Sequence, residues 1–281
     1  MGTSKSSSGP SGGIPLLPDW VDDQEGQDGN DNHNEENQNG EDSPKDDQKE
    51  ERRPKTESWR PVRTAFTSYL KNPTKKKLGN TLGKYVKGTG GSKKISSSVI
   101  SGKSTGARFG GFLSDIVEKG SSEALKILGV GDIEGKSAEY VFTKLAELLS
   151  PKGNEADDPY ARSAISETLA TIYEELEEDE KSIDDLESLT PEIANGYMVT
   201  YIGTYIYQRL MAELGKSLVE RSDYSEKQLI DREYEIKEYI QETLKIEFKD
   251  SDLTKVDFSS PEGKEKIDEI FNDAYSILED L

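Results

Sequence analysis

The chain has 281 residues, of which 32% are hydrophobic and 33% are charged, and its formal net charge is −20. With so few apolar side chains, we expect one domain with long polar appendages. The absence of cysteine and the presence of a single histidine, His33, exclude a thiol nucleophile, a disulfide framework and a Cys/His zinc site.

The first 20 residues predict a peptide that binds a partner. Mostly small residues up to Gly13 precede the segment Ile14-Pro15-Leu16-Leu17-Pro18-Asp19-Trp20. This stretch has too few apolar groups to fold alone. Leu16, Leu17 and Trp20 are nevertheless side chains of the kind that anchor an extended peptide in a partner's groove.

We expect residues 1–20 to bind a membrane poorly. The start Met1-Gly2-Thr3-Ser4-Lys5-Ser6 fits a short N-myristoylation pattern, but acidic residues follow where a second, basic signal is needed. The sequence contains neither a signal-like segment nor an apolar run of membrane-spanning length, so we expect a cytoplasmic protein without a membrane partner. What remains of the motif is Gly2, a candidate N-terminus with an unhindered amine.

The charges lie in three blocks along the chain. Residues 1–51 contain 3 Lys/Arg and 14 Asp/Glu, residues 52–108 contain 15 Lys/Arg and one Glu, and residues 109–281 carry a net charge of −23. Residues 21–58 form a polar stretch that cannot bury a core, and we expect them to be a disordered acidic spacer. The next segment, 59–111, is rich in Lys, Gly and Ser.

Segment 59–111 is expected to contain short helices. Apolar residues recur at helical spacing from Val62 to Leu70 and are stopped by Asn72-Pro73. Glycines at the density seen from Gly79 to Gly111 are typical of close helix packing or of a loop around an anion, and the spacing leaves both open.

Residues 112–281 predict an acidic, all-α domain with the character of an irregular helical bundle. Helical apolar spacing recurs from Val141 to Leu149, and helix starts are expected at Asp158-Pro159, Thr190-Pro191, Ser225 and Ser260-Pro261. The helix from Thr190 carries apolar residues over so wide an arc, with Ile193 among them, that we expect it to be the central one. No alternating strand pattern appears.

No catalytic motif passes inspection. Ser101-Gly102-Lys103-Ser104-Thr105 resembles the end of a P-loop, but Ser97 stands where its first glycine belongs, so a solvated Lys/Ser/Gly segment is expected instead. Asp28 to Asn39 lacks the glycine and the glutamate of a calcium loop. The carboxylate runs between Glu174 and Asp185 are typical of a wet helix face. The sequence therefore predicts a protein that is not an enzyme and that has no cofactor or metal.

The basic segment 52–108 allows two interpretations. It is an electrostatic footprint for phosphate, which favours contact with DNA or RNA. It can equally neutralise the chain's own acidic blocks or those of a partner. The candidate contact residues are Lys75, Lys76, Lys77, Lys84, Lys87, Lys93, Lys94, Lys103 and Arg108.

Several motifs together resemble the QatB family of the bacterial Qat antiphage defence system. They are Met1-Gly2-Thr3-Ser4, Ser8-Gly9-Pro10, the Ile14 to Trp20 segment, Tyr85-Val86-Lys87-Gly88-Thr89-Gly90-Gly91-Ser92 and Gly110-Gly111-Phe112-Leu113. The resemblance implies a non-catalytic subunit that works beside an ATPase (QatA), a QueC-like ATP-using enzyme (QatC) and a TatD-like nuclease (QatD).

The resemblance also implies a role for the N-terminus. QueC-like enzymes activate a carboxyl group with ATP and join it to an amine, so Gly2 is the candidate acceptor. The peptide that the QueC-like partner would grip includes Thr3, Ser4, Gly9, Pro10, Pro15, Leu16, Leu17, Pro18 and Trp20. The alternative function is an adaptor that recruits phage DNA or RNA to the nuclease through residues 52–108.

Overall fold

The computed structural model describes residues 59–131, 136–178, 186, 189–219, 224–249, 251, 256–258 and 260–281. All of them belong to the second of the two units into which the chain divides, 1–53 and 54–281. The predicted peptide 1–20 and spacer 21–58 lie outside the described residues. The described residues form helices and no strand, which confirms the all-α prediction.

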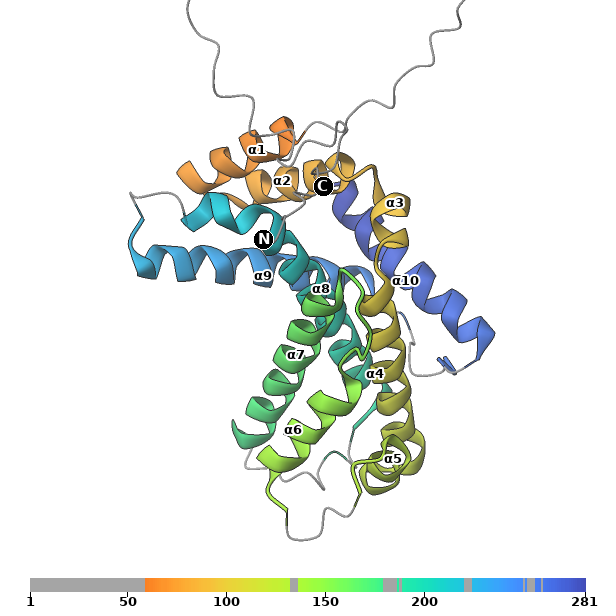
Figure 1. Ribbon diagram of the computed structural model, residues 1–281. Helices are drawn as coiled ribbons and strands as arrows, with labels where there is room; N and C mark the ends of the chain where they lie inside the picture. The colour runs from red at the N-terminus through yellow and green to blue at the C-terminus, as the bar shows by residue number, and fades with distance from the viewer. Residues whose placement is uncertain are drawn as a thin grey trace, which may run out of the picture. The chain divides into compact units, whose positions relative to one another are not determined.

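Ten helices follow one another in the described part of the unit 54–281 (Figure 1). They are α1 (Arg60–Lys71), α2 (Lys75–Gly88), α3 (Ser92–Ser97), α4 (Ile100–Lys119), α5 (Ser121–Leu128), α6 (Ala138–Leu149), α7 (Asp158–Glu178), α8 (Pro191–Val219), α9 (Glu226–Glu247) and α10 (Pro261–Glu279). None of these described helices combines the length and the apolarity that a membrane span requires.

Helix α8 is the centre of the packing, as its apolar pattern predicted. It packs against α4, α7 and α9, and Figure 1 shows it between them. Tyr201 and Tyr205 are fully buried in this helix, where their rings contact Phe109 of α4 and Phe271 of α10. Ile193 was expected to point inward, but 46% of its surface is exposed, whereas the next residue, Ala194, is fully buried, so the inward face of the first turn of α8 is the one that carries Ala194.

Two predicted helix starts have the expected caps. Ser225 and Gln228 form a capping box at the start of α9, in which each side chain satisfies the other residue's backbone N–H. Ser260 accepts a hydrogen bond from the Gly263 N–H, and Pro261 occupies the first turn of α10. Local sequence alone therefore determines where these helices begin.

Helix α4 runs without a break from Ile100 to Lys119 and so crosses the boundary expected at residue 111. The prediction of a solvated segment at Ser101 to Thr105 was wrong, because Ser101 and Thr105 are 4% and 0% exposed. Glycines explain the burial. A Cβ atom at Gly102 would lie 2.6 Å from the Tyr205 ring, and one at Gly110 would lie 2.5 Å from the Phe258 ring. These two glycines serve helix packing.

We predict opposite effects for two α4 glycines. Gly102→Ala should lower the free energy of unfolding by about 1–3 kcal/mol, because the added methyl group overlaps Tyr205 and Val99. Gly111→Ala is the matched control, since nothing lies within 4 Å of its Cβ position, and it should raise stability by about 0.5–1 kcal/mol. Urea denaturation followed by circular dichroism measures both. Equal effects at the two positions would contradict the packing interpretation.

Candidate functional site

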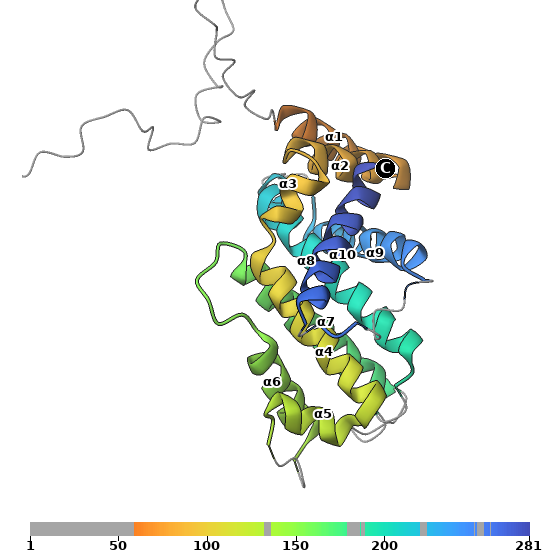
Figure 2. The same ribbon diagram turned by 90° about the vertical axis from the view of Figure 1, so that its right-hand side faces the viewer.

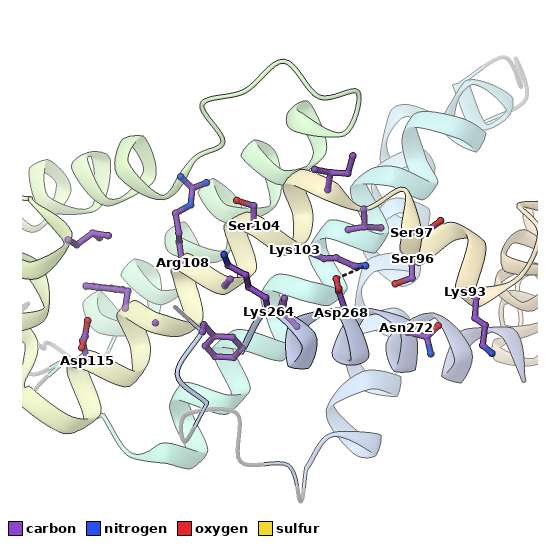
Figure 3. A pocket seen from close by; sticks show the side chains of 18 of the residues that line it. Lys93, Ser96, Ser97, Lys103, Ser104, Arg108, Asp115, Lys264, Asp268 and Asn272 are labelled. Carbon is purple, nitrogen blue, oxygen red and sulfur yellow. Dashed lines mark ion pairs between the residues drawn. The ribbon is translucent and has the colours of Figure 1, made fainter. Parts of the chain in front are cut away.

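An open cleft of about 960 Å³ lies between α3, α4 and α10, with the end of α5 at one side (Figure 3). We call it the α4–α10 cleft. Figure 2 shows α4 and α10 beside each other, and the two helices are in contact. A volume of this size is at the upper end of ordinary ligand pockets.

One face of each helix lines the cleft at helical spacing. The lining residues of α4 are Ile100, Lys103, Ser104, Ala107, Arg108, Gly111, Phe112 and Asp115, and those of α10 are Lys264, Ile267, Asp268 and Asn272. Phe258, just before α10, adds its ring to the floor. The cleft thus combines an apolar floor with a charged rim.

The rim carries more uncompensated positive than negative charge. Lys103 pairs with Asp268 across the cleft at 2.9 Å, and Asp115 pairs with Lys119 at 2.6 Å. In the part of the chain that the structure describes, Lys93 and Lys264 have no carboxylate partner, although both line the cleft. An anionic group would therefore be favoured along this rim.

Arg108 is the most constrained of these cations. Its Nη2 donates a hydrogen bond to Thr105 Oγ1 at 3.2 Å, while its buried Nε has no partner among the described residues. Burial lowers the pKa of the guanidinium below its ordinary value, and no described carboxylate opposes the effect. Arginine remains charged at neutral pH even so, which leaves a half-buried cation whose hydrogen-bonding capacity is not fully used.

A buried carboxylate fixes the start of α4, and with it one wall of the cleft. Asp157 accepts hydrogen bonds from the backbone N–H groups of Ser101 and Gly102, at 3.1 and 3.0 Å, and from the Tyr205 hydroxyl at 2.9 Å. An anion at a helix N-terminus satisfies free N–H groups and interacts favourably with the helix dipole. Asp157 therefore ties α4 to the central helix α8.

The neighbouring groups complete this network. Ser101 Oγ donates to the carboxylate of Asp158, the first residue of α7, so this hydrogen bond joins the start of α7 to the start of α4. The Tyr201 hydroxyl donates to the Gly102 carbonyl oxygen at 2.8 Å. Burial is the main cause that raises the pKa of both Tyr201 and Tyr205 above their ordinary value, so both remain hydrogen-bond donors at any physiological pH.

The structure places the predicted basic contact residues in different parts of the fold. It places Lys93, Lys103 and Arg108 in the α4–α10 cleft. On α2, Lys75 pairs with Glu242 at 3.4 Å and Lys77 donates to the Ser68 carbonyl oxygen, so these two contact other elements. The remaining predicted contacts, Lys76, Lys84, Lys87 and Lys94, do not line the cleft.

Sequence reasoning missed the second wall of the cleft. Lys264, Ile267 and Asp268 lie more than 150 positions after the basic segment, in a helix whose charges are mixed. No local signal marks them, since only the packing of α10 on α4 places them opposite Arg108. The predicted peptide residues from Gly2 to Trp20 lie outside the described residues, so their role stays a prediction.

No metal site was predicted, and the described residues contain no group of three or more His, Cys, Asp or Glu side chains placed to hold an ion.

Two members of the carboxylate runs between Glu174 and Asp185 accept hydrogen bonds from tyrosines. Glu175 accepts from the Tyr197 hydroxyl at 2.8 Å, and Glu177 accepts from the Tyr173 hydroxyl at 2.5 Å.

The helical unit is thus an all-α protein with a large open cleft between two of its helices. A family model described as "Qat anti-phage system associated protein QatB" matches residues 90–278, a range that contains the whole cleft. The chain belongs to the QatB family, and so to an anti-phage defence system. No curated protein and no solved structure matches it.

Removal of the Asp157 carboxylate should weaken the whole unit. Asp157→Ala leaves two backbone N–H groups and one hydroxyl unsatisfied in a buried place, so the free energy of unfolding should fall by about 3–5 kcal/mol. Tyr205→Phe removes one of these hydrogen bonds and should cost about 1–2 kcal/mol. Thermal and urea unfolding measure both. A smaller loss for Asp157→Ala than for Tyr205→Phe would show that Asp157 does not hold α4.

Proposed function

We propose that this protein is a non-catalytic scaffold subunit of its anti-phage complex, with an N-terminal peptide that a QueC-like ATP-using partner binds and modifies at Gly2. In this proposal the unit 54–281 docks on other subunits, an ATPase and a TatD-like nuclease among them. The first 53 residues present the peptide. Membership of the QatB family supports an accessory role in such a system.

The observation that carries the docking role is the α4–α10 cleft. It is open, and two apolar side chains at its edge, Ile100 and Ile127, are each 53% exposed. Apolar side chains that face an open cleft are stabilised when a partner covers them. The cleft lies within the matched family range, which supports the proposal that this surface serves the accessory role.

The chemistry proposed for the N-terminus follows from its sequence. Pro10, Pro15 and Pro18 favour an extended peptide, which loses little entropy when it is bound. Leu16, Leu17 and Trp20 would fill pockets of the partner and hold the Gly2 amine close to an activated carboxyl group. The amine would then attack that carboxyl carbon and form an amide, while the bond from this carbon to the oxygen of the activating nucleotide phosphate breaks, the nucleotide phosphate leaves, and the nitrogen loses a proton.

Intact-mass analysis tests this modification. The full-length chain, co-expressed with the QueC-like partner, should gain the mass of one carboxylic acid minus water, and fragmentation should place the added mass on Gly2. Trp20→Ala should lower the modified fraction at least tenfold, because the anchor is lost, whereas Asn30→Ala in the spacer should not. An unmodified N-terminus in a system that still defends against phage would refute the acceptor role.

A second candidate function is an adaptor that binds DNA or RNA. The observation that favours it is the exposure of Lys76 and Lys87 on α2, neither of which has an ion-pair partner among the described residues. Such lysines can replace the counterions of a nucleic acid.

Salt dependence tests the adaptor function. The double variant Lys76→Glu/Lys87→Glu should bind a DNA duplex more weakly, and the slope of log K against log salt should become shallower by about 2. Lys227→Glu on α9 is the control and should change neither quantity. Binding that does not weaken as salt is added would exclude this function.

A further inference from the structure

The face of α4 that lines the cleft differs from the face that packs inside. A Cβ atom added at Gly102, Gly106 or Gly110 would meet packed side chains within 4 Å, the Phe258 ring under the cleft among them, whereas one added at Gly111 would meet none. Together with Ser104 and Ala107, Gly111 forms a row of small residues at helical spacing along the cleft. Internal packing accounts for the glycines of the inner face but not for Gly111.

The cleft has the length of a helix binding groove. Its α4 wall extends from Ile100 to Asp115, which is about 22 Å at the rise of an α-helix. The α10 wall from Lys264 to Asn272 lies opposite (Figure 3). Three to four turns of a further helix, at about 5.4 Å a turn, would fit along the α4 wall. Small residues on one wall let a helix backbone approach closely.

The side chains define the chemistry of the occupant. The floor of the cleft is apolar but already covered, since Phe112, Phe258 and Ile267 are 3–5% exposed. Ile100 and Ile127 at its edge are each 53% exposed, and they would pack against the apolar face of a helix. Lys93, Arg108 and Lys264 have no carboxylate partner among the described residues and lie around that floor. They would pair with acidic residues at the edges of the helix. A nucleic acid fits less well, because its phosphates would leave the exposed side chains of Ile100 and Ile127 uncovered.

We propose that the α4–α10 cleft is the docking groove for an amphipathic helix with acidic edges, contributed by another subunit of the complex. This inference rests on the scaffold function proposed above and names the kind of partner segment that the scaffold binds. The apolar face of that helix covers Ile100 and Ile127, and its Asp and Glu side chains lie beside Arg108 and Lys264.

Site-specific crosslinking in the assembled complex tests the groove. A photoreactive benzoylphenylalanine placed at Gly111 of the full-length chain, co-purified with the subunits encoded beside it, should crosslink to one segment of another subunit. Mass spectrometry should identify that segment as a helix with apolar residues at i, i+3 and i+4 and with Asp or Glu beside them. Crosslinks to a basic segment, to nucleic acid or to a second copy of this chain, or no crosslink at all, would overturn the proposal.

Charge reversal and steric block provide an independent readout. Lys264→Glu and Ala107→Trp should each weaken association with that subunit at least tenfold. Lys266→Glu is the matched control on α10, because Lys266 pairs with Glu269 and does not line the cleft. Equal affinities for all three variants would also overturn the proposal, provided circular dichroism shows that they are folded.

The docking-groove proposal and the proposed modification of Gly2 can be refuted separately. Modification of Gly2 is read by intact mass and does not depend on Lys264 or Ala107. If the groove variants bind normally while Gly2 is modified, only the groove assignment is wrong. If Gly2 is unmodified while the crosslink appears as expected, only the acceptor role is wrong.

Discussion

The arrangement of the helical unit depends on the buried carboxylate of Asp157. It is 5% exposed and accepts hydrogen bonds from the first turn of α4 and from Tyr205 of α8. A helix start that is buried without such a partner would leave several N–H groups unsatisfied. Because Asp157 supplies the missing acceptor, α4 can begin inside the protein, and its outer face becomes a wall of the cleft.

One face of helix α4 packs inside the protein, and the other lines the cleft. On the inner face, Gly102 and Gly110 allow the Tyr205 and Phe258 rings to approach the helix backbone. On the outer face, small residues and cations border an apolar floor. The glycine-rich composition of the basic segment is thus a packing requirement at some positions and a surface property at others. Spacing alone could not separate the two, since both kinds of glycine occur in one helix.

The basic block of the sequence does not act as one surface. Lys75 and Lys103 are paired with acidic side chains from α9 and α10, which are helices of the acidic block. Part of the positive charge is therefore used to attach the basic segment to the acidic one. The rest is divided between the exposed side of α2 and the rim of the cleft. Of the two alternatives at the level of sequence, self-neutralisation is observed for Lys75 and Lys103, and the binding role is a proposal that concerns other residues.

The all-α class, the start of α9 at a capping box and the central position of α8 could be read from the sequence, because they depend on helical periodicity and on hydrogen bonds between residues three apart. The burial of Ser101 and Thr105 and the position of Lys264 opposite Arg108 follow from the packing of helices that are distant in the sequence. The physical reason is distance along the chain. Asp157 and α10 reach α4 from 55 and more residues away, and no local pattern records a contact that packing alone creates.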